Sequence, residues 1–273
     1  MFKRISSFAL AMTLSLSIWV QQAAALEGPS IFVDGAQVEA ASAFLYQETM
    51  YVSLYNVTLA LRPDAVITWE GDHALVTAEG LSLTAYPGAR YLQVNGRYLY
   101  LPYGVRSENG DTMVPVRTLT QALGAQLWWE ASDGNVYLTR GTGAILSGGE
   151  YYSEDAVYWL SHIIYAESGS QPLEGKIAVG NVILNRVRSS SFPNTVEGVI
   201  FDRKDAVQFE PVSNGRVYLP PASQSVEAAK RALDGENVVG SALYFYAPAL
   251  SQGMWINANR PYQQTIGCHR FYR

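Results

Sequence analysis

One glutamate in the carboxyl-terminal half lies where a carboxyl group could act as an acid. Glu167 follows Ile164 by three residues and Leu160 by seven, so helical periodicity places it on an apolar face, in the last turn before Gly169. Burial disfavours the charged form of a carboxyl, which then keeps its proton near neutral pH and can donate it. A glutamate that turns toward solvent, or one in a structural salt bridge with Arg186, also suits this position.

A second carboxylate for glycoside chemistry is not evident from the sequence. Glycosidases commonly pair an acid with a nucleophile or base. Glu174 is the nearest acid, but a place in the first turn of the next helix explains it. Glu210 and Asp205 lie further along the chain, and either could activate water. The sequence therefore favours chemistry that one acid can carry out.

Metal-ligating residues are few and scattered. His73, His162 and His269 are far apart, and Cys268 is the only cysteine, so an internal disulfide is excluded. None of them has a tight spacing such as His-x-x-x-His, so we expect no metal and no cofactor. A zinc site assembled from distant residues stays open.

The elements that must position these residues are helices followed by short strands. Ser153 is expected to cap a first helix, and a second should begin at Pro172. A third is expected over Ser223–Leu233. Strands are expected over Ala242–Ala247 and Gln264–Tyr272, which predicts an α+β class with a small sheet last.

The first residues are typical of an export signal. Lys3 and Arg4 precede an apolar run over Phe8–Val20, and Ala23–Ala25 offers a small-residue cleavage site. The alternative is a membrane anchor, but the run is shorter than the ~20 apolar residues that a span needs. Removing residues 1–25 would change the formal net charge from −5 to −7, which disfavours a nucleic-acid partner.

An internal repeat occupies the region between this signal and the helices. The first copy starts at Glu48 and reads ETMYVSLYNVTLALRPDAVITWEGDHALVT. The second copy starts at Asp111 and reads DTMVPVRTLTQALGAQLWWEASDGNVYLT. Each copy is expected to run strand, short helix, strand ending in Trp-Glu, turn and strand. A hairpin signal, Asp34-Gly35 or Asn95-Gly96, precedes each copy, because these pairs tolerate positive φ.

Residues 31–140 resemble the copper amine oxidase N-terminal-like domain, a small α+β module. The best-matching segment runs from Met113-Val114-Pro115-Val116-Arg117 to Trp129-Glu130. The resemblance implies a wall-binding or scaffolding role for residues 26–141, and copper is not expected because His73 is alone there. Tyr91, Tyr98, Tyr100 and Tyr103 could contact a wall or simply pack a sheet. The glycine-rich stretch 142–152 is interpreted as a linker.

Residues 153–273 resemble the cell-wall hydrolase family of spore cortex-lytic enzymes, the SleB type. The stretch from Val157 reads VYWLSHIIYAESGSQPLEGKIAVGNVILNRVRSSSFPNTVEGVIF, and later segments read QFEPVSNG, ALYFYAPAL and TIGCHRFY. The pair Glu167-Ser168 is also similar to the Glu-Ser signature of lytic transglycosylases and goose-type lysozymes. The resemblance implies a lysozyme-like helical catalytic domain with a small β-sheet.

The family motifs carry over to this sequence residue by residue. Glu167 matches the catalytic glutamate of the Tyr-Ala-Glu segment, and the resemblance implies substrate contacts for Tyr165, Ser168, Asn185, Gln208, Phe209, Tyr246, Trp255 and His269. Two departures are present. Ser168-Gly169-Ser170 stands where the family more often has Ala-Arg-Gly, which leaves the local sugar contacts open. Cys268 stands where Asn is usual, which leaves the contact of that side chain open as well.

Together these features predict a secreted enzyme of the cell wall or spore envelope that cleaves peptidoglycan, without stable membrane insertion. A lytic transglycosylase needs only Glu167, because the muramic acid closes a 1,6-anhydro ring with its own hydroxyl. The alternatives are a hydrolytic muramidase that uses Glu210 or Asp205, a zinc-dependent N-acetylmuramoyl-L-alanine amidase, and a non-catalytic wall-binding protein. The substrate could be spore cortex or vegetative wall.

Overall fold

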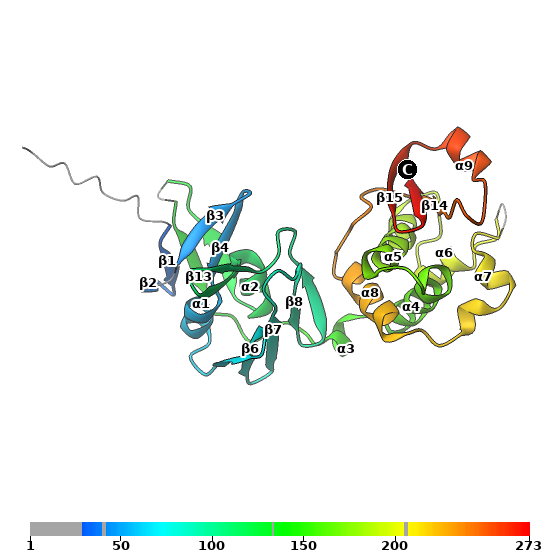
Figure 1. The fold of residues 1–273 in the computed structure, drawn as a ribbon. Helices are drawn as coiled ribbons and strands as arrows, with labels where there is room; N and C mark the ends of the chain where they lie inside the picture. Colours follow the sequence, from blue (N-terminus) through cyan, green and yellow to red (C-terminus); the bar gives the residue numbers. More distant parts are fainter. Residues whose placement is uncertain (1–28, 40–41, 133, 205–206) are drawn as a thin grey trace, which may run out of the picture.

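The structure is a computed structural model, and it describes residues 29–39, 42–132, 134–204 and 207–273. The predicted signal over residues 1–25 lies outside the described residues. One group of buried apolar side chains lies before a short helix, α3 (Gly148–Tyr151), and two further groups lie after it. Figure 1 shows the two halves on either side of α3, which we call the amino-terminal module and the carboxyl-terminal half. No helix among the described residues is both long and apolar enough to span a bilayer.

The described residues of the module form three small sheets and two helices around one apolar core. The largest sheet is an antiparallel meander of β5 (Val66–Glu70), β6 (His73–Ala78), β7 (Leu81–Ala85), β8 (Tyr91–Val94) and β9 (Arg97–Tyr100). A second sheet has the order β10 (Arg106–Glu108), β11 (Asp111–Pro115), β4 (Thr49–Ser53) and β3 (Ala43–Tyr46). The third has the order β12 (Gln126–Trp129), β13 (Val136–Thr139), β1 (Ile31–Val33) and β2 (Ala36–Gln37).

The predicted repeat is confirmed element by element. The first copy forms β4, α1 (Leu54–Leu61), β5 and β6, and the second forms β11, α2 (Val116–Ala122), β12 and β13. The two copies meet where β4 and β11 pair antiparallel, with Val52 opposite Val114. Both predicted hairpin turns are present, since Asp34 and Asn95 adopt φ of 49° and 50° before their glycines. The local turn chemistry was therefore readable from the sequence.

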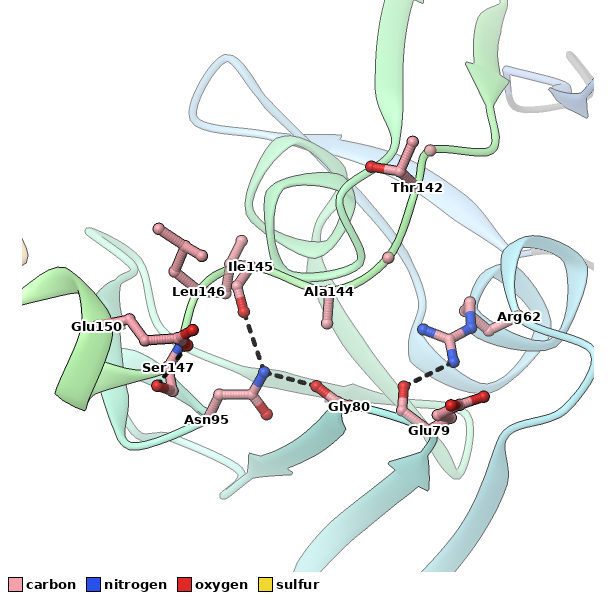
Figure 2. Close-up of a pocket in the computed structure, with 12 residues that line it drawn as sticks. Arg62, Glu79, Gly80, Asn95, Thr142, Ala144, Ile145, Leu146, Ser147 and Glu150 are labelled. Carbon is pink, nitrogen blue, oxygen red and sulfur yellow. Dashed lines mark hydrogen bonds between the residues drawn. The ribbon is translucent and has the colours of Figure 1, made fainter.

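The segment between the halves is held against the module (Figure 2). The side-chain amide of Asn95 donates to the Gly80 and Ile145 carbonyls at 2.8 and 3.1 Å. The backbone carbonyl of Asn95 accepts from the Gly148 N–H at 2.8 Å. Ser147 begins α3 with a capping box to Glu150. The connection is thus ordered by specific contacts with the module.

The carboxyl-terminal half packs three longer helices together, with shorter ones around them. The longer helices are α4 (Glu154–Ser168), α5 (Leu173–Arg188) and α8 (Ser223–Leu233), and the shorter ones are α6 (Val196–Ile200), α7 (Glu210–Ser213), η1 (Arg216–Tyr218) and α9 (Met254–Asn259). Gly180 allows α5 to approach both neighbours, because a Cβ there would lie 3.0 Å from Ile164 on α4 and 3.4 Å from Ala232 on α8.

A three-stranded antiparallel sheet of β14 (Tyr244–Tyr246), β16 (His269–Tyr272) and β15 (Tyr262–Ile266) completes this half. The α+β class is confirmed, as are the cap at Ser153 and the helix over Ser223–Leu233. The single strand expected over Gln264–Tyr272 is wrong. That stretch is a hairpin, because Gly267 adopts a φ of 57° and turns the chain between β15 and β16. Pro172 is the residue before the first helical turn of α5 rather than its first member.

The two halves contact each other through a buried ion pair. The Asp234 carboxylate, 0% exposed, accepts from Arg97 Nη2 at 2.7 Å and Nε at 3.1 Å, and from the Tyr98 N–H at 2.7 Å. The Tyr152 hydroxyl donates to the same carboxylate. Nearby, the Arg231 guanidinium of α8 lies 4.6 Å from the centre of the Tyr91 ring. Tyr91 therefore packs against the carboxyl-terminal half.

Candidate active site

Glu167 lies in the last turn of α4 and lines a cavity of about 570 Å³. Burial raises the pKa of its carboxyl from 4.5 to about 7, the Arg216 cation opposes this shift, and the Glu210 carboxylate adds to it. A carboxyl with a pKa near 7 is protonated in about half of the molecules at neutral pH, so it can both donate and accept a proton. The expectation that burial would raise this pKa matches the environment found.

Residues from four parts of the chain line this cavity. They are Tyr165, Ala166, Glu167, Gly169, Ser170 and Gln171 from the end of α4 and the loop after it, Glu210, Pro211, Arg216 and Leu219 from α7 and η1, Ala247 and Leu250 after β14, and Cys268 and His269 at the start of β16. The cavity thus combines one protonatable acid, a second carboxylate and a cation.

Arg216 and Glu210 line the same cavity as Glu167, and the charges of both act on its carboxyl. Arg216 Nη2 donates to the Ala166 carbonyl at 3.0 Å, which holds the cation beside the last turn of α4. Glu210 begins α7 and contributes the second carboxylate. The other acid considered for water activation, Asp205, lies outside the described residues. No salt bridge joins Glu167 to Arg186 among the described residues, so that structural alternative is not seen.

Gln171 joins two segments that line the cavity, and the sequence did not predict this role. Its side-chain carbonyl accepts from the Cys268 N–H at 2.9 Å, and its backbone carbonyl accepts from the buried Lys176 ammonium. The loop after Glu167 is thereby joined to the β15–β16 turn. A long-range contact of this kind leaves no periodic signal in the sequence.

His269 faces the cavity from the sheet. It is 4% exposed, and burial lowers the pKa of its imidazole, so the ring is neutral at pH 7. The neighbouring thiol, Cys268 Sγ, lies 3.8 Å from Nδ1. His269 is therefore placed to accept or donate a hydrogen bond as a neutral group rather than to supply a charge.

Of the predicted substrate-contacting residues, Tyr165 and His269 line the cavity with Glu167, and the others lie elsewhere. Ser168 is buried and its hydroxyl donates to the Ile164 carbonyl at 2.7 Å. Asn185 donates to the Gly240 and Ala242 carbonyls at 2.8 and 2.9 Å. Their bonds brace the fold around the cavity, and direct contact with substrate stays a prediction for them.

The other residues predicted to contact substrate lie in two places. Gln208 and Phe209 lie beside Arg186, and Tyr246 and Trp255 lie on β14 and α9. Arg186, 5% exposed, donates to the Leu243 carbonyl at 2.7 Å and to Gln208 Oε1 at 3.3 Å. Its guanidinium lies 5.3 Å from the Phe209 ring centre, and burial lowers its pKa to about 10. Tyr246 hydrogen-bonds Asn257, and Trp255 is 56% exposed on α9.

No group of three or more His, Cys, Asp or Glu side chains that could hold a metal ion occurs among the described residues. A larger cavity, about 870 Å³, lies beside the connecting segment (Figure 2). Two acids line it, Glu79 and Glu150, and hydrogen bonds from Ser147 lower the pKa of Glu150. Arg62, also in the lining, donates to the Glu79 backbone carbonyl. The pKa shift of Glu150 is opposite in direction to that of Glu167.

Both halves of the chain match known families. Residues 170–272 match the family described as Cell Wall Hydrolase, and residues 32–138 match the family described as Copper amine oxidase N-terminal domain. The first match begins three residues after Glu167, so the role of that glutamate is not part of the matched region.

Several spore cortex-lytic enzymes match 120 residues of this chain. The spore cortex-lytic enzyme of Bacillus cereus is 40% identical over 120 residues, which cover 44% of this chain and 45% of that protein. The enzyme of the same name from Bacillus subtilis is 36% identical over 120 residues, covering 44% and 38%. The chain thus matches less than half the length of these relatives.

Two solved structures are similar to part of the chain. One is the catalytic domain of the germination-specific lytic transglycosylase SleB from Bacillus anthracis, 38% identical, covering 47% of this chain and all of that one, with a TM-score of 0.41. The other is the catalytic domain of the Bacillus cereus SleB protein, 39% identical, covering 45% and 92%, with a TM-score of 0.41.

Proposed function

Because its carboxyl-terminal domain belongs to the cell wall hydrolase family, we propose that this chain cleaves the glycan strand of peptidoglycan with Glu167 as the proton donor and acceptor. The observation that carries the proposal is the raised pKa of this carboxyl, about 7, in a cavity that also holds Glu210 and Arg216. Sequence identity of 38% with a lytic transglycosylase domain supports the reaction class.

The proposed reaction is an intramolecular transglycosylation. Glu167 gives its proton to the glycosidic oxygen, and the bond between that oxygen and C1 of N-acetylmuramic acid breaks. The 6-hydroxyl oxygen of the same sugar bonds to C1, and its proton returns to the Glu167 carboxylate. No water is consumed and the product end is a 1,6-anhydro-muramic acid.

The surroundings of Glu167 suit the charges that develop in these steps. The Glu210 carboxylate faces the same cavity and would stabilise positive charge on the sugar ring. Arg216 would stabilise the Glu167 carboxylate after it has given up its proton. No metal or cofactor takes part in the proposal.

The second candidate function is a hydrolytic muramidase, which the position of Glu210 favours. In that reaction Glu210 would take a proton from water, and the water would attack C1 after Glu167 protonates the leaving oxygen. The product would then carry a free reducing end. Glu210→Gln would remove most of the activity in this case, whereas a transglycosylase would retain a larger part of it.

Product analysis tests the proposal directly. Purified cortex and vegetative sacculi are digested with the full chain, and the ends are identified by mass spectrometry before and after borohydride reduction. We expect anhydro-muramic ends that borohydride does not change. Reducing ends would establish hydrolysis instead, and cleavage of stem peptides without new glycan ends would contradict both candidates. The preferred sacculus identifies the substrate as spore cortex or vegetative wall.

We further propose that the amino-terminal domain, residues 26–141, positions the enzyme on the wall and carries no chemistry, and that residues 1–25 direct export to the wall or spore envelope. The copper amine oxidase N-terminal family match supports the domain assignment. Residues 150–273 alone should cleave soluble glycan fragments at a rate similar to the full chain, but should clear sacculi more slowly. A truncated chain that folds and cleaves neither would contradict this division.

A further inference from the structure

Gln171 lines the same cavity as Glu167, but the proposed reaction does not use it. It lies in the loop between α4 and α5, directly before Pro172. A residue before proline is restricted largely to extended conformations, so the backbone at Gln171 has little freedom. The side chain is half-buried and uncharged. Any contribution that Gln171 makes to the site must therefore come through its hydrogen bonds.

Both backbone polar groups of Gln171 are occupied within the fold. Its N–H donates to the Ser168 carbonyl at 2.9 Å, and its carbonyl accepts from the Lys176 ammonium. Lys176 is 3% exposed and also donates to Gln224 Oε1 at 3.3 Å. A buried ammonium needs such acceptors, because desolvation without them is costly. These bonds fix the Gln171 backbone relative to the end of α4 and the start of α5.

The side-chain oxygen of Gln171 is occupied as well. Oε1 accepts from the Cys268 N–H at 2.9 Å. The turn allows this close approach because Gly267 has no side chain, and a Cβ there would collide with Oε1. An N–H group can donate only to the oxygen of a side-chain amide, so this bond also decides which way the amide is turned. The side-chain nitrogen, Nε2, must point away from the Cys268 N–H.

Nε2 is the polar atom of Gln171 that has no partner among the described residues. Within that part of the chain no acceptor lies at hydrogen-bonding distance from it. It is also not one of the enclosed polar atoms that lack a partner, so protein does not cover it. Two N–H donors are thus held in a fixed orientation and are open to a molecule in the cavity. Donors that are fixed before binding cost little further ordering when a ligand accepts from them.

The charges of the cavity lining indicate which acceptor suits these donors. Arg216 is the only cation among the described lining residues, and a guanidinium group is the preferred partner of a carboxylate. Gln171 instead bonds to Cys268, next to the neutral ring of His269. A neutral N–H donor suits an uncharged carbonyl oxygen. Each sugar of a peptidoglycan strand offers one such oxygen, that of its N-acetyl group.

We propose that the Gln171 side-chain amide donates a hydrogen bond to the N-acetyl carbonyl of a sugar in the cavity and makes the enzyme selective for N-acetylated over N-deacetylated glycan. An N-deacetylated sugar carries an ammonium group in place of the acetamido group. Because an ammonium accepts no hydrogen bond, Nε2 would be left unpaired, which costs affinity. This inference rests on the proposed function, since it names the form of the same substrate that the cavity prefers.

The test measures dissociation constants of full-length Glu167→Gln protein, which leaves its ligand uncut. Three ligands are compared: soluble glycan strands without stem peptides, the same strands after treatment with a deacetylase, and the deacetylated strands after re-acetylation with acetic anhydride. We expect roughly 10-fold tighter binding of the acetylated strands, the usual effect of leaving one donor unpaired, and full recovery on re-acetylation. Equal binding of acetylated and deacetylated strands would overturn the proposal.

Two further changes, each added to the Glu167→Gln protein, separate the donor from the contact with Cys268. Gln171→Glu keeps an oxygen for the Cys268 N–H but has no donor, and its carboxylate would attract the ammonium of a deacetylated sugar. The preference for acetylated strands should therefore disappear or reverse. Gln171→Met removes both donor and acceptor and should also abolish the preference. A preference that persists in either variant would overturn the proposal.

Gln224 offers matched controls. It is exposed in the first turn of α8, bonds to the same Lys176, and is not among the described residues that line the cavity. Gln224→Glu and Gln224→Met should keep the preference, and an equal loss in these variants would overturn the proposal. A thermal melt identifies variants that unfold. If Gln171→Met is one of them, Gln171→Glu, which keeps the contact with Cys268, decides the outcome.

Cleavage by the unmodified chain separates this proposal from the proposed function. A chain that binds acetylated strands more tightly but cuts no strand would refute the proposed function while supporting the role of Gln171. Cleavage of acetylated and deacetylated strands with equal kcat/KM would refute the role of Gln171 and leave the proposed function standing.

Discussion

The catalytic candidate of the carboxyl-terminal half holds its carboxyl group differently from the paired acids of the amino-terminal module. In the amino-terminal module, acids lie beside partners: Asp64 accepts two hydrogen bonds from Arg62, which lower its pKa to about 2, and Asp34 pairs with Arg140 at 2.5 Å. In the carboxyl-terminal half, Glu167 has no salt bridge among the described residues, and burial raises its pKa to about 7. The module stabilises charged forms, whereas the cavity stabilises a neutral acid.

This difference distinguishes structural from chemical use of a carboxyl group. A paired acid favours its charged form and contributes to the fold, whereas an acid held by burial alone opposes its own ionisation and costs stability at neutral pH. Groups of the second kind cluster at functional sites because only function retains them. Four predictions test this contrast, from the largest expected effect to the smallest.

The largest effect is expected from Glu167→Gln, which should lower glycan cleavage by about 10²- to 10⁴-fold, the usual contribution of general acid–base catalysis. Gln keeps the shape and a hydrogen-bonding group but transfers no proton. The measurement is turbidity loss of sacculi together with a thermal melt. Glu174→Gln is the control, because Glu174 is exposed in the first turn of α5. Near-normal activity of the Glu167 variant would remove this residue from the mechanism.

Asp234→Ala should destabilise the contact between the halves by about 3–5 kcal/mol, because it leaves Arg97 buried without its carboxylate. The expected result is a lower melting temperature and faster proteolysis between residues 141 and 153. Asp72→Asn serves as the control, since the Asp72 side chain is 88% exposed. Unchanged stability of the Asp234 variant would mean that the two halves do not depend on this ion pair.

The pH dependence should reflect a pKa of about 7 for Glu167. Cleavage needs the protonated acid, so kcat/KM should fall above pH 7, approaching tenfold per pH unit. Between 4.5 and 7 the folded chain holds a proton that the unfolded chain has lost, so rising pH destabilises the native protein. Glu167→Gln should remove this loss, which amounts to about 3 kcal/mol for a shift of this size.

These two curves are measured as kcat/KM on soluble glycan and as melting temperature of the native and Gln proteins from pH 4 to 9. A difference between the two proteins that does not grow with pH would show that the carboxyl is charged in the folded state. The cavity would then resemble the paired sites of the module.

The smallest effect is expected from metal chelation. EDTA should leave glycan cleavage within experimental error, since the described residues contain no cluster of three or more metal-ligating side chains. Turnover that is lost in EDTA and restored by zinc would instead support the amidase alternative.

Much of the local structure followed from the sequence alone. The cap at Ser153, the turn pairs at Asp34 and Asn95, and the repeated strand–helix–strand–strand order depend on residues close together in the chain, which is why periodicity and turn chemistry predicted them. Glu167 was found in the same way, because its spacing from Ile164 placed a carboxyl on an apolar face. Motif resemblance added the families of both halves.

The surroundings of that carboxyl depended on contacts between distant residues. Packing of α7 and the small sheet against the end of α4 brought Glu210 and His269 to the cavity, and the bond from Cys268 to Gln171 joined its walls. Asn185 and Gln208, predicted to contact substrate, form hydrogen bonds within the protein, with the Gly240 carbonyl and with Arg186. Helical spacing identified the acid, but only the tertiary structure decided its pKa, since desolvation and neighbouring charges depend on every element packed around it.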